Sequence, residues 1–430
     1  MQMSHDVTIL IESKLEKWPF PQSTPSIFKV EYGNIRLGQR DSTLHPEIVS
    51  IGPYHHHNSK LQKMEQLKYT YLKQLLERKK EPSVKSYVSA VKGMEKRARR
   101  CYSEPLDLDE NQFVMLMLVD GIFLIELLRY SRSKYLRHAN DPVFKHEMIL
   151  SQLRHDILLM ENQLPFFVLN QLFEMTKIND DDELSSLALG FVDGFLLNSS
   201  VSGVVLKRLH AKNIDHILGL IHEVWCLPFA DMLPATGGGK GDFEEWENIH
   251  SVSRLKQFGV KFKRKSTRVS FMDITFANGV LKIPQLNIFD ETESQLKNLI
   301  AYEQFLPDGK PRYASDYAFL MHCLITDSND VQELRCHGII GNWLGGDEEV
   351  CQMFDRLGRN ILISSEFSYI QVFHAVNKHC SRRVEKWKAN LRRNYFNSPW
   401  SILSVLAAVI LLVLTGFQTG YTIGTYYRHR

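Results

Sequence analysis

The stretch FVMLMLVDGIFLIELL, residues 113–128, is almost wholly apolar but carries Asp120 and Glu126. An aspartate at the centre of a bilayer costs about 2.5 to 3.5 kcal/mol, and Gly121 and Glu126 weaken the apolar run further. The stretch therefore predicts a helix buried in the core of a folded domain, and it places the chain in a mainly α class.

Two neighbouring stretches extend this helical reading. Residues 60–80, KLQKMEQLKYTYLKQLLERKK, carry apolar residues mostly three and four positions apart and precede Pro82, a pattern typical of an amphipathic helix. Residues 149–173 also read as a core helix, but they contain Pro165. Because proline lacks the N–H that an inner turn needs, we expect a kink or a break there.

A small β element interrupts the helices in the second half of the chain. Residues 269–289, VSFMDITFANGVLKIPQLNIF, alternate around Asn278 and Gly279, the dipeptide that favours a type I′ hairpin turn. Pro284 should place the second strand at a sheet edge or end it. Thr292 and Gln295 follow with the spacing of a capping box, which predicts the start of a helix.

The charge distribution argues against a nucleic-acid-binding surface. The 430 residues have a formal net charge of +3, but residues 378–430 hold nine Lys or Arg and one acid. The part before residue 378 keeps 43 basic and 48 acidic residues, a net charge of −5. The basic excess thus belongs to the tail, and we expect no nucleic-acid partner.

The tail has the features of a membrane anchor. From Ser401 to Gly420, with Tyr421 as the furthest end, the sequence is free of charge and rich in Leu, Val and Ile. About 20 such residues suffice to cross a hydrocarbon core of roughly 30 Å. We therefore predict one C-terminal transmembrane helix, with the lipid bilayer as a partner and residues 394–430 as anchor and short tail.

Basic residues before this segment predict its orientation. They are Arg382, Arg383, Lys386, Lys388, Arg392 and Arg393. Because positive charge is retained on the cytoplasmic side, the large N-terminal part should be cytosolic, at the plasma membrane or an endomembrane. Gly416, Gly420 and Gly424 recur every four residues, a spacing that lets helices approach closely in a bilayer and predicts a homodimer through this helix.

Few residues suggest a cofactor. The six cysteines are scattered without CxxC pairs, which favours reduced thiols over disulfides or a zinc site. His55, His56 and His57 are consecutive, so they cannot all face one ion on regular structure. His222 and Glu223 resemble the start of HExxH, but Cys226 replaces the second histidine. We predict no metal, no cofactor and no catalytic residues.

One glycine-rich stretch marks a linker. Residues 237–240, GGGK, lack the first glycine and the Ser or Thr of a phosphate loop. Together with the prolines and acids around them, they favour a linker over residues 228–247. The predicted organisation is an N-terminal extension over residues 1–26, a mostly helical domain over residues 27–393 and the anchor.

Several phrases together resemble a known plant family, the domain of unknown function 247. They are SIGPYHHH (residues 50–57), MLVDGIFLIELL (117–128), DILLMENQLPFFVL (156–169) and ITFANGVLKIPQLNIFDETESQLKNLIAYEQ (274–304). The match runs from about residue 27 to the C-terminus. The resemblance implies a membrane-anchored plant protein without established enzymatic activity, and some members are associated with pollen recognition in self-incompatibility.

The leading hypothesis is therefore a partner-binding or signalling protein that contacts another protein. The alternative is a membrane-tethered enzyme, such as a hydrolase or transferase, whose acids include Asp120 or Glu161. A buried pocket with strongly shifted carboxylates would favour the enzyme, and an exposed apolar patch would favour partner binding.

Overall fold

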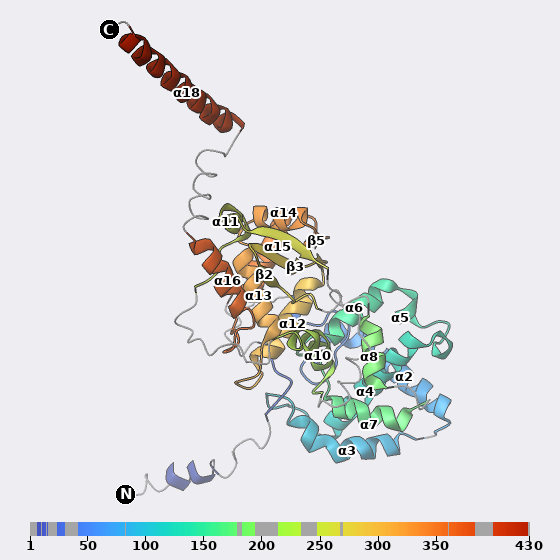
Figure 1. Cartoon of the computed structure of the whole chain (residues 1–430). Helices are drawn as coiled ribbons and strands as arrows, with labels where there is room; N and C mark the ends of the chain where they lie inside the picture. The colour runs from blue at the N-terminus through green and yellow to red at the C-terminus, as the bar shows by residue number, and fades with distance from the viewer. Residues whose placement is uncertain are drawn as a thin grey trace. The chain divides into compact units, whose positions relative to one another are not determined.

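The computed structural model describes residues 7–9, 11–13, 15, 24–30, 42–81, 83–178, 183–193, 214–233, 247–266, 270–359, 361–382 and 399–428. The chain divides into two compact units (Figure 1). The first comprises Met1–Pro228 and Glu291–Asp308, and the second comprises Phe229–Asp290 and Gly309–Arg430. The chain therefore leaves the first unit and returns to it for one helix.

The first unit is helical. Its helices are α2 (Gln62–Lys79), α3 (Lys85–Arg99), α4 (Glu110–Arg132), α5 (Pro142–Lys145), α6 (Glu147–Ile157), α7 (Phe166–Thr176), α8 (Leu184–Val192), most of α10 (Ile217–Ala230) and α12 (Thr292–Gln304). Short 3₁₀ turns lie at Ser42–Leu44, Ser59–Leu61 and Lys134–Leu136. The mainly helical prediction is confirmed for this unit.

Helix α4 forms the centre of the first unit, as predicted from residues 113–128. It packs against α2, α3, α7 and α8, and nearly all of that stretch is buried. A capping box between Asp109 and Gln112 fixes its start. Gly121 lets α7 approach, because a Cβ atom there would lie 2.6 Å from Leu172 Cδ1.

The two acids of α4 are paired inside the core. Asp120 Oδ1 lies 2.6 Å from the Nζ atom of Lys68, on α2. Glu126 contacts Arg129 at 2.9 Å and Arg78 at 2.7 Å. A buried charge is tolerated when a partner and hydrogen bonds compensate its lost hydration. Asp120 and Glu126, whose charges argued against a membrane-spanning helix, are therefore buried as ion pairs in the core of the first unit.

Pro165 and Pro228 affect the helices in different ways. Helix α6 ends at Ile157, and Pro165 is the N-cap residue of α7, so the predicted break is confirmed. Pro228 instead lies inside α10, which continues to Ala230. The predicted linker thus starts within a helix, and its residues 234–246 lie outside the described part of the chain.

The second unit combines helices with two small sheets. Its helices are α11 (Val252–Gln257), α13 (Tyr313–Leu324), α14 (Ser328–Cys336), α15 (Asp347–Gly358), α16 (Ile370–Ser381) and α18 (Pro399–Arg428). Its strands are β1 (Lys261–Lys265), β2 (Thr275–Ala277), β3 (Val280–Pro284), β4 (Leu286–Ile288) and β5 (Ile340–Asn342). The sheets have the orders β1-β3-β2 and β4-β5.

The hairpin is confirmed with one difference. Strands β2 and β3 pair antiparallel, and the turn residues Asn278 and Gly279 have positive φ angles of 53° and 75°, as a type I′ turn requires. Strand β3 is central rather than at an edge, because β1 pairs with its other side in parallel. Pro284 is its last residue, so the proline ends the strand.

The predicted transmembrane helix is wrong. Residues 399–428 do form one helix, α18, but none of the helices in the described part of the chain is both long and apolar enough to cross a membrane. In the sequence the unbroken apolar run of α18 lies between Ser404 and Thr415 and covers residues 405–414, about half of the roughly 20 residues needed. Thr415, Gln418 and Thr419 then interrupt it.

The expectations attached to that helix lose their basis or stay untested. Arg383, Lys386, Lys388, Arg392 and Arg393 lie outside the described residues. Association through Gly416, Gly420 and Gly424 stays a prediction that the structure does not test.

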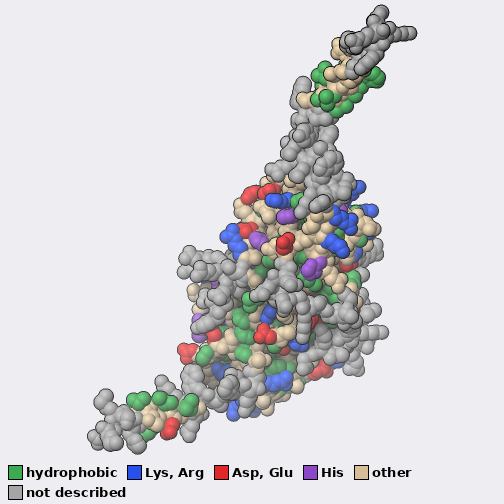
Figure 2. Space-filling view, turned by 60° about the vertical axis from the view of Figure 1, so that its left-hand side comes forward, with side chains coloured by type: hydrophobic (Ala, Val, Ile, Leu, Met, Phe, Trp, Pro, Cys, Tyr) green, Lys and Arg blue, Asp and Glu red, His purple; other side chains and the backbone are tan. Residues whose placement is uncertain are grey.

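On the face that Figure 2 shows, basic and acidic side chains are interspersed.

Candidate functional site

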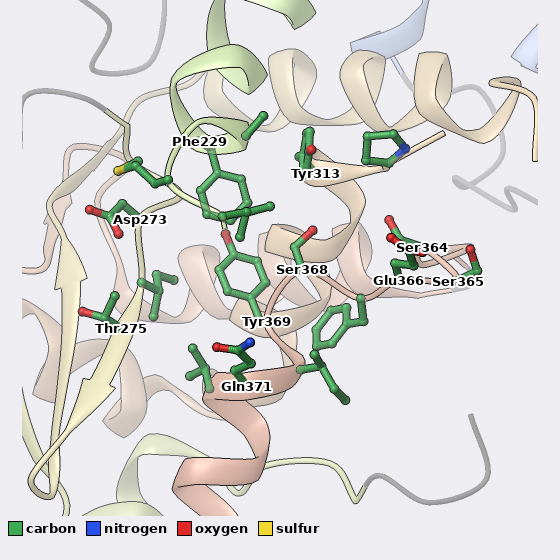
Figure 3. Close-up of a pocket in the computed structure, with 18 of the residues that line it drawn as sticks. Phe229, Asp273, Thr275, Tyr313, Ser364, Ser365, Glu366, Ser368, Tyr369 and Gln371 are labelled. Atoms are coloured by element: carbon green, nitrogen blue, oxygen red, sulfur yellow. The ribbon is translucent and has the colours of Figure 1, made fainter. Parts of the chain in front are cut away.

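The second unit contains a cavity of about 470 Å³. The end of α10, the start of β2, residues 309–313 and residues 364–372 surround it (Figure 3). Ligand pockets typically have volumes of about 300 to 1,000 Å³ and an apolar lining with a few polar groups. This cavity has the size of a binding site, and its lining combines apolar and aromatic side chains with polar ones.

One wall of the cavity is aromatic. The ring of Phe229 stacks on that of Tyr369 with centroids 5.4 Å apart, and the ring of Tyr313 meets Phe229 edge-on at 5.4 Å. The Tyr369 hydroxyl donates to the Met272 carbonyl oxygen at 2.7 Å. Figure 3 shows Phe229 and Tyr369 side by side. These contacts fix the rings of Phe229 and Tyr369, which are 3% and 1% exposed, so the wall is preorganised and Tyr313 is its half-buried member.

The loop before α16 is held by a buried carboxylate. Asp316, on α13, accepts hydrogen bonds from the backbone N–H groups of Ser364 and Ser368 at 2.9 Å each. It also accepts one from the Ser368 hydroxyl at 2.7 Å. The Ser364 hydroxyl in turn accepts the Arg312 N–H at 2.8 Å. These hydroxyl groups therefore shape the cavity.

The polar groups at the cavity mouth have mixed character. Lys310, Ser365, Glu366 and Gln371 are exposed lining residues, and Asp273 is paired with Lys265 at 2.6 Å. Among the described residues, the lining includes neither histidine nor cysteine, so it offers no serine–histidine or cysteine–histidine couple there. With one lysine against two carboxylates, the mouth also does not favour a polyanion such as a nucleotide.

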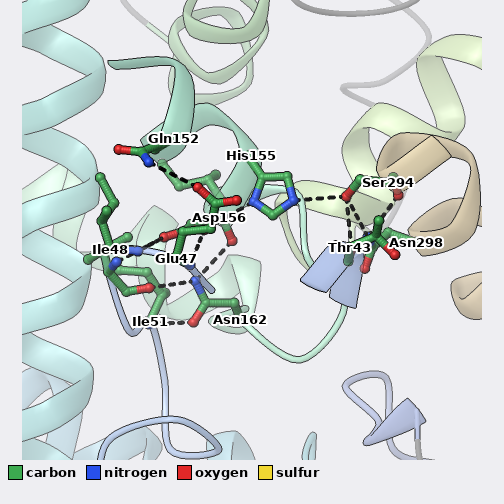
Figure 4. A network of polar contacts seen from close by, with 12 residues as sticks. Thr43, Glu47, Ile48, Ile51, Gln152, His155, Asp156, Asn162, Ser294 and Asn298 are labelled. Atoms are coloured by element: carbon green, nitrogen blue, oxygen red, sulfur yellow. Dashed lines mark hydrogen bonds and ion pairs between the residues drawn. The ribbon is translucent and has the colours of Figure 1, made fainter. Parts of the chain in front are cut away.

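The polar residues of the family phrase DILLMENQ take part in a hydrogen-bond network in the first unit (Figure 4). The Asp156 carboxylate accepts the successive N–H groups of Glu47, Ile48 and Val49, each at 2.8 Å. Asn162 accepts the Ile51 N–H at 2.7 Å. The polar residues of DILLMENQ thus replace the strand or helix partners that residues 47–51 lack, which satisfies buried backbone groups.

The same network contains a Ser–His–Asp chain. His155 lies between Asp156, 3.1 Å from its Nδ1 atom, and Ser294, 3.0 Å from its Nε2 atom (Figure 4). A nucleophilic serine must give its proton to the histidine, but the Ser294 hydroxyl donates to the Thr43 carbonyl oxygen at 2.8 Å. Ser294 is also only 5% exposed. The Ser–His–Asp arrangement is therefore better suited to holding Thr43 against α12.

The acids of the enzyme alternative serve the core. Asp120 is 3% exposed, and besides Lys68 it binds the Gly52 N–H at 2.8 Å. Glu161 is 4% exposed and accepts the Val30 N–H at 2.8 Å. Burial alone would raise the pKa of Glu161, but hydrogen bonds from His55 and Val30 bring it below its ordinary value. Neither acid lines the cavity.

The three consecutive histidines separate as predicted. His55 lies 3.2 Å from Glu161 and edge-on to His45 at 5.7 Å, whereas His56 and His57 contact each other. His45, His55 and Glu161 place ligand atoms within 4.8 Å of one another. Sequence reasoning missed this group because His45 and Glu161 are distant in the chain.

A second such group is fully buried. His222 and Cys226 lie one turn apart on α10, and Glu303 reaches them from α12. The His222 Nε2 atom is 2.8 Å from Glu303 Oε1 and 3.4 Å from Cys226 Sγ. The HExxC pattern in the sequence was the signal for two of these residues. Only the fold supplies the third.

Comparisons with known proteins agree with the resemblance. The pattern of the family DUF247, described as plant protein of unknown function, matches residues 27–414. The chain is 29% identical to the UPF0481 protein At3g47200 of Arabidopsis thaliana, over 93% of this chain and 86% of the relative. It is 24% identical to a second Arabidopsis UPF0481 protein, At3g02645, over 95% and 92%. No solved structure matches.

Proposed function

We propose that this chain, which belongs to the DUF247 family of plant proteins of unknown function, binds a protein partner through the cavity of its second unit. The observation that carries the proposal is the preorganised aromatic wall formed by Phe229, Tyr313 and Tyr369. The ligand is an apolar or aromatic side chain of the partner.

The chemistry of the cavity supports this ligand class. An apolar side chain that enters gains about 25 cal/mol for each Å² removed from water, and a contact with the half-buried Tyr313 ring adds about 0.5 to 1.5 kcal/mol. The exposed Ser365, Glu366 and Gln371 at the mouth suit the polar backbone on either side of such a side chain. A preformed site also avoids part of the ordering cost of binding.

A second feature of the same unit supports partner binding. Phe289 and Trp343 stack with ring centroids 5.8 Å apart, and they are 45% and 69% exposed. Tryptophan is enriched among the residues that dominate the binding energy of protein interfaces, and exposed apolar patches mark interaction sites. This pair is the kind of exposed apolar patch that favours partner binding over catalysis.

The test is a selection of displayed random peptides on the full chain, followed by affinity measurements on the selected peptides. We expect these peptides to share an aromatic or leucine anchor. Ser365→Trp places a large side chain at the mouth without touching the aromatic wall, and it should weaken binding at least about tenfold. Tyr135→Trp is the control, because Tyr135 is fully exposed in the first unit.

Equal affinity of the selected peptides for both variants and the wild type would contradict the proposal that the cavity binds them.

The hydrolase alternative is tested separately with a fluorophosphonate probe, because the Ser294–His155–Asp156 arrangement is the observation that favours it. We expect no labelling of Ser294, since its proton is donated to Thr43. The role in pollen recognition that the family resemblance implied stays a prediction.

A further inference from the structure

We infer that His222, Cys226 and Glu303 form a binding site for a Zn²⁺ ion inside the first unit. This site lies outside the cavity of the proposed function and does not depend on it. The inference rests on which atoms converge, on their burial and on their summed charge.

The three ligand atoms converge on one point. His222 and Cys226 are four residues apart on α10, so they lie on the same helix face. Glu303 comes from α12, 81 residues away from His222 in sequence. All three ligand atoms lie within 4.8 Å of one another. Imidazole, thiolate and carboxylate are the usual ligands of zinc, at about 2.0 to 2.3 Å.

The contacts of His222 converge on one of its two ring nitrogens. Glu303 Oε1 and Cys226 Sγ both approach the same Nε2 atom of His222. In the metal-free protein a proton on Nε2 is donated to the carboxylate, with the sulfur as a second, weak acceptor. In a triad for proton transfer the two partners would use different ring nitrogens. Three ligands around one ion, by contrast, require this convergence.

The charges also balance in the buried site. His222, Cys226 and Glu303 are 6%, 4% and 0% exposed, so an unbalanced charge there would be costly. A thiolate and a carboxylate together neutralise Zn²⁺, and the neutral imidazole adds no charge. The Cys226 thiol proton is released to solvent when the metal binds, because the thiolate is the ligand.

A neighbouring aromatic residue holds the histidine ring. Tyr302 meets the His222 ring edge-on, with centroids 5.1 Å apart, and the Tyr302 hydroxyl donates to Asp215 at 3.1 Å. This edge-on contact restricts the orientation of the His222 ring. Three protein ligands leave the fourth tetrahedral position to water or another small molecule.

The experiment titrates the full chain, stripped with a chelator, with Co²⁺ alone and then with Zn²⁺. Tetrahedral cobalt gives visible absorption, and a cobalt–thiolate bond adds a charge-transfer band. We expect one equivalent of Co²⁺ to produce both signals and Zn²⁺ to remove them. Cys226→Ser should abolish the thiolate band, and Glu303→Gln should weaken binding at least about tenfold.

Cys336→Ser is the matched control, because Cys336 is an exposed cysteine of the second unit, and its spectrum should equal that of the wild type. Far-ultraviolet circular dichroism checks that each variant is folded. A folded wild type without the thiolate band at one equivalent of Co²⁺, or a band that survives in Cys226→Ser, would overturn the inference. Neither result bears on peptide binding by the cavity, so the two proposals fail separately.

Discussion

Each unit contains a buried aspartate, and the two carboxylates are compensated by different kinds of partner. In the first unit, Asp120 is paired with the ammonium group of Lys68, which also contacts Glu65 at 2.6 Å. In the second unit, Asp330 is 0% exposed and accepts from the N–H groups of Ser253 and Thr326 and from the Thr326 hydroxyl. Asp120 thus depends on a cation together with the Gly52 N–H, and Asp330 depends on several neutral donors.

This difference teaches where each unit is vulnerable. Burial alone would lower the pKa of Lys68, but Asp120 and Glu65 raise it above its ordinary value, so the ammonium form is favoured. Removal of that cation leaves the Asp120 charge buried with the Gly52 N–H as its remaining donor among the described residues. Removal of one neutral donor from Asp330 would leave the others in place. The first unit should therefore respond more strongly to a single substitution.

The largest effect is expected for Lys68→Met. It strands the Asp120 carboxylate in the core and should lower the free energy of unfolding by about 3 to 5 kcal/mol. Urea denaturation, followed by circular dichroism, measures it. Lys73→Met is the control, because the Lys73 side chain is 78% exposed and lies 3.9 Å from Glu77. Similar midpoints for the two variants would contradict the comparison.

A somewhat smaller change in the free energy of unfolding is expected when the pH falls, because the first unit keeps the buried His216 ring neutral. His216 Nε2 lies 3.0 Å from the Ser26 carbonyl oxygen, and its Nδ1 accepts the Gly219 N–H at 3.0 Å. A protonated Nδ1 could not accept that bond. Burial, only partly opposed by the bond to Ser26, lowers the pKa of His216 to about 4 from 6.5.

Because the unfolded chain binds this proton at higher pH than the folded chain, stability is fully present above pH 6.5 and is lost as the pH falls toward 4. The loss attributable to His216 should approach about 3 kcal/mol. Unfolding free energies measured from pH 7 to pH 4 check it. His216→Gln should flatten this slope while lowering stability at pH 7. An unchanged slope would mean that His216 is not the titrating group.

The smallest of the three effects is expected for Asp330→Asn. The variant keeps one carbonyl oxygen in place but removes the charge from hydrogen bonds that are worth about 1.5 to 3 kcal/mol with an ionised acceptor. We expect a loss of about 2 kcal/mol, measured as above. A loss larger than that of Lys68→Met would reverse the proposed contrast between the units.

Local chemistry explains which predictions from sequence were confirmed. Asn278 and Gly279 form their turn because both tolerate a positive φ angle, and Pro165 separates two helices wherever they pack. The capping box expected at Thr292 did not form: Glu291 is the N-cap residue of α12 without a side-chain cap bond. Ser294 instead bonds to Thr43, 251 residues away, a partner that no local pattern reveals.

The candidate sites could not be predicted from the sequence because their residues are also distant from one another along the chain. The HExxC pattern of His222 and Cys226 looked incomplete, because Glu303 joins it only through the packing of α12 against α10. The cavity combines Phe229, Tyr313 and Tyr369 from three separate segments. Asp120 and Glu161 looked like candidate acids in sequence, but their backbone partners Gly52 and Val30 show that they fasten the core.

The sequence by itself determined the helical class, the central place of α4, the hairpin turn and the family. These depend on spacing along the chain and on the conformational limits of glycine, asparagine and proline, which act over a few residues. Tertiary structure alone decided which polar residues are paired, which converge on a common point and where the cavity lies. Those outcomes depend on contacts between residues tens to hundreds of positions apart, and one-dimensional periodicity carries no information about them.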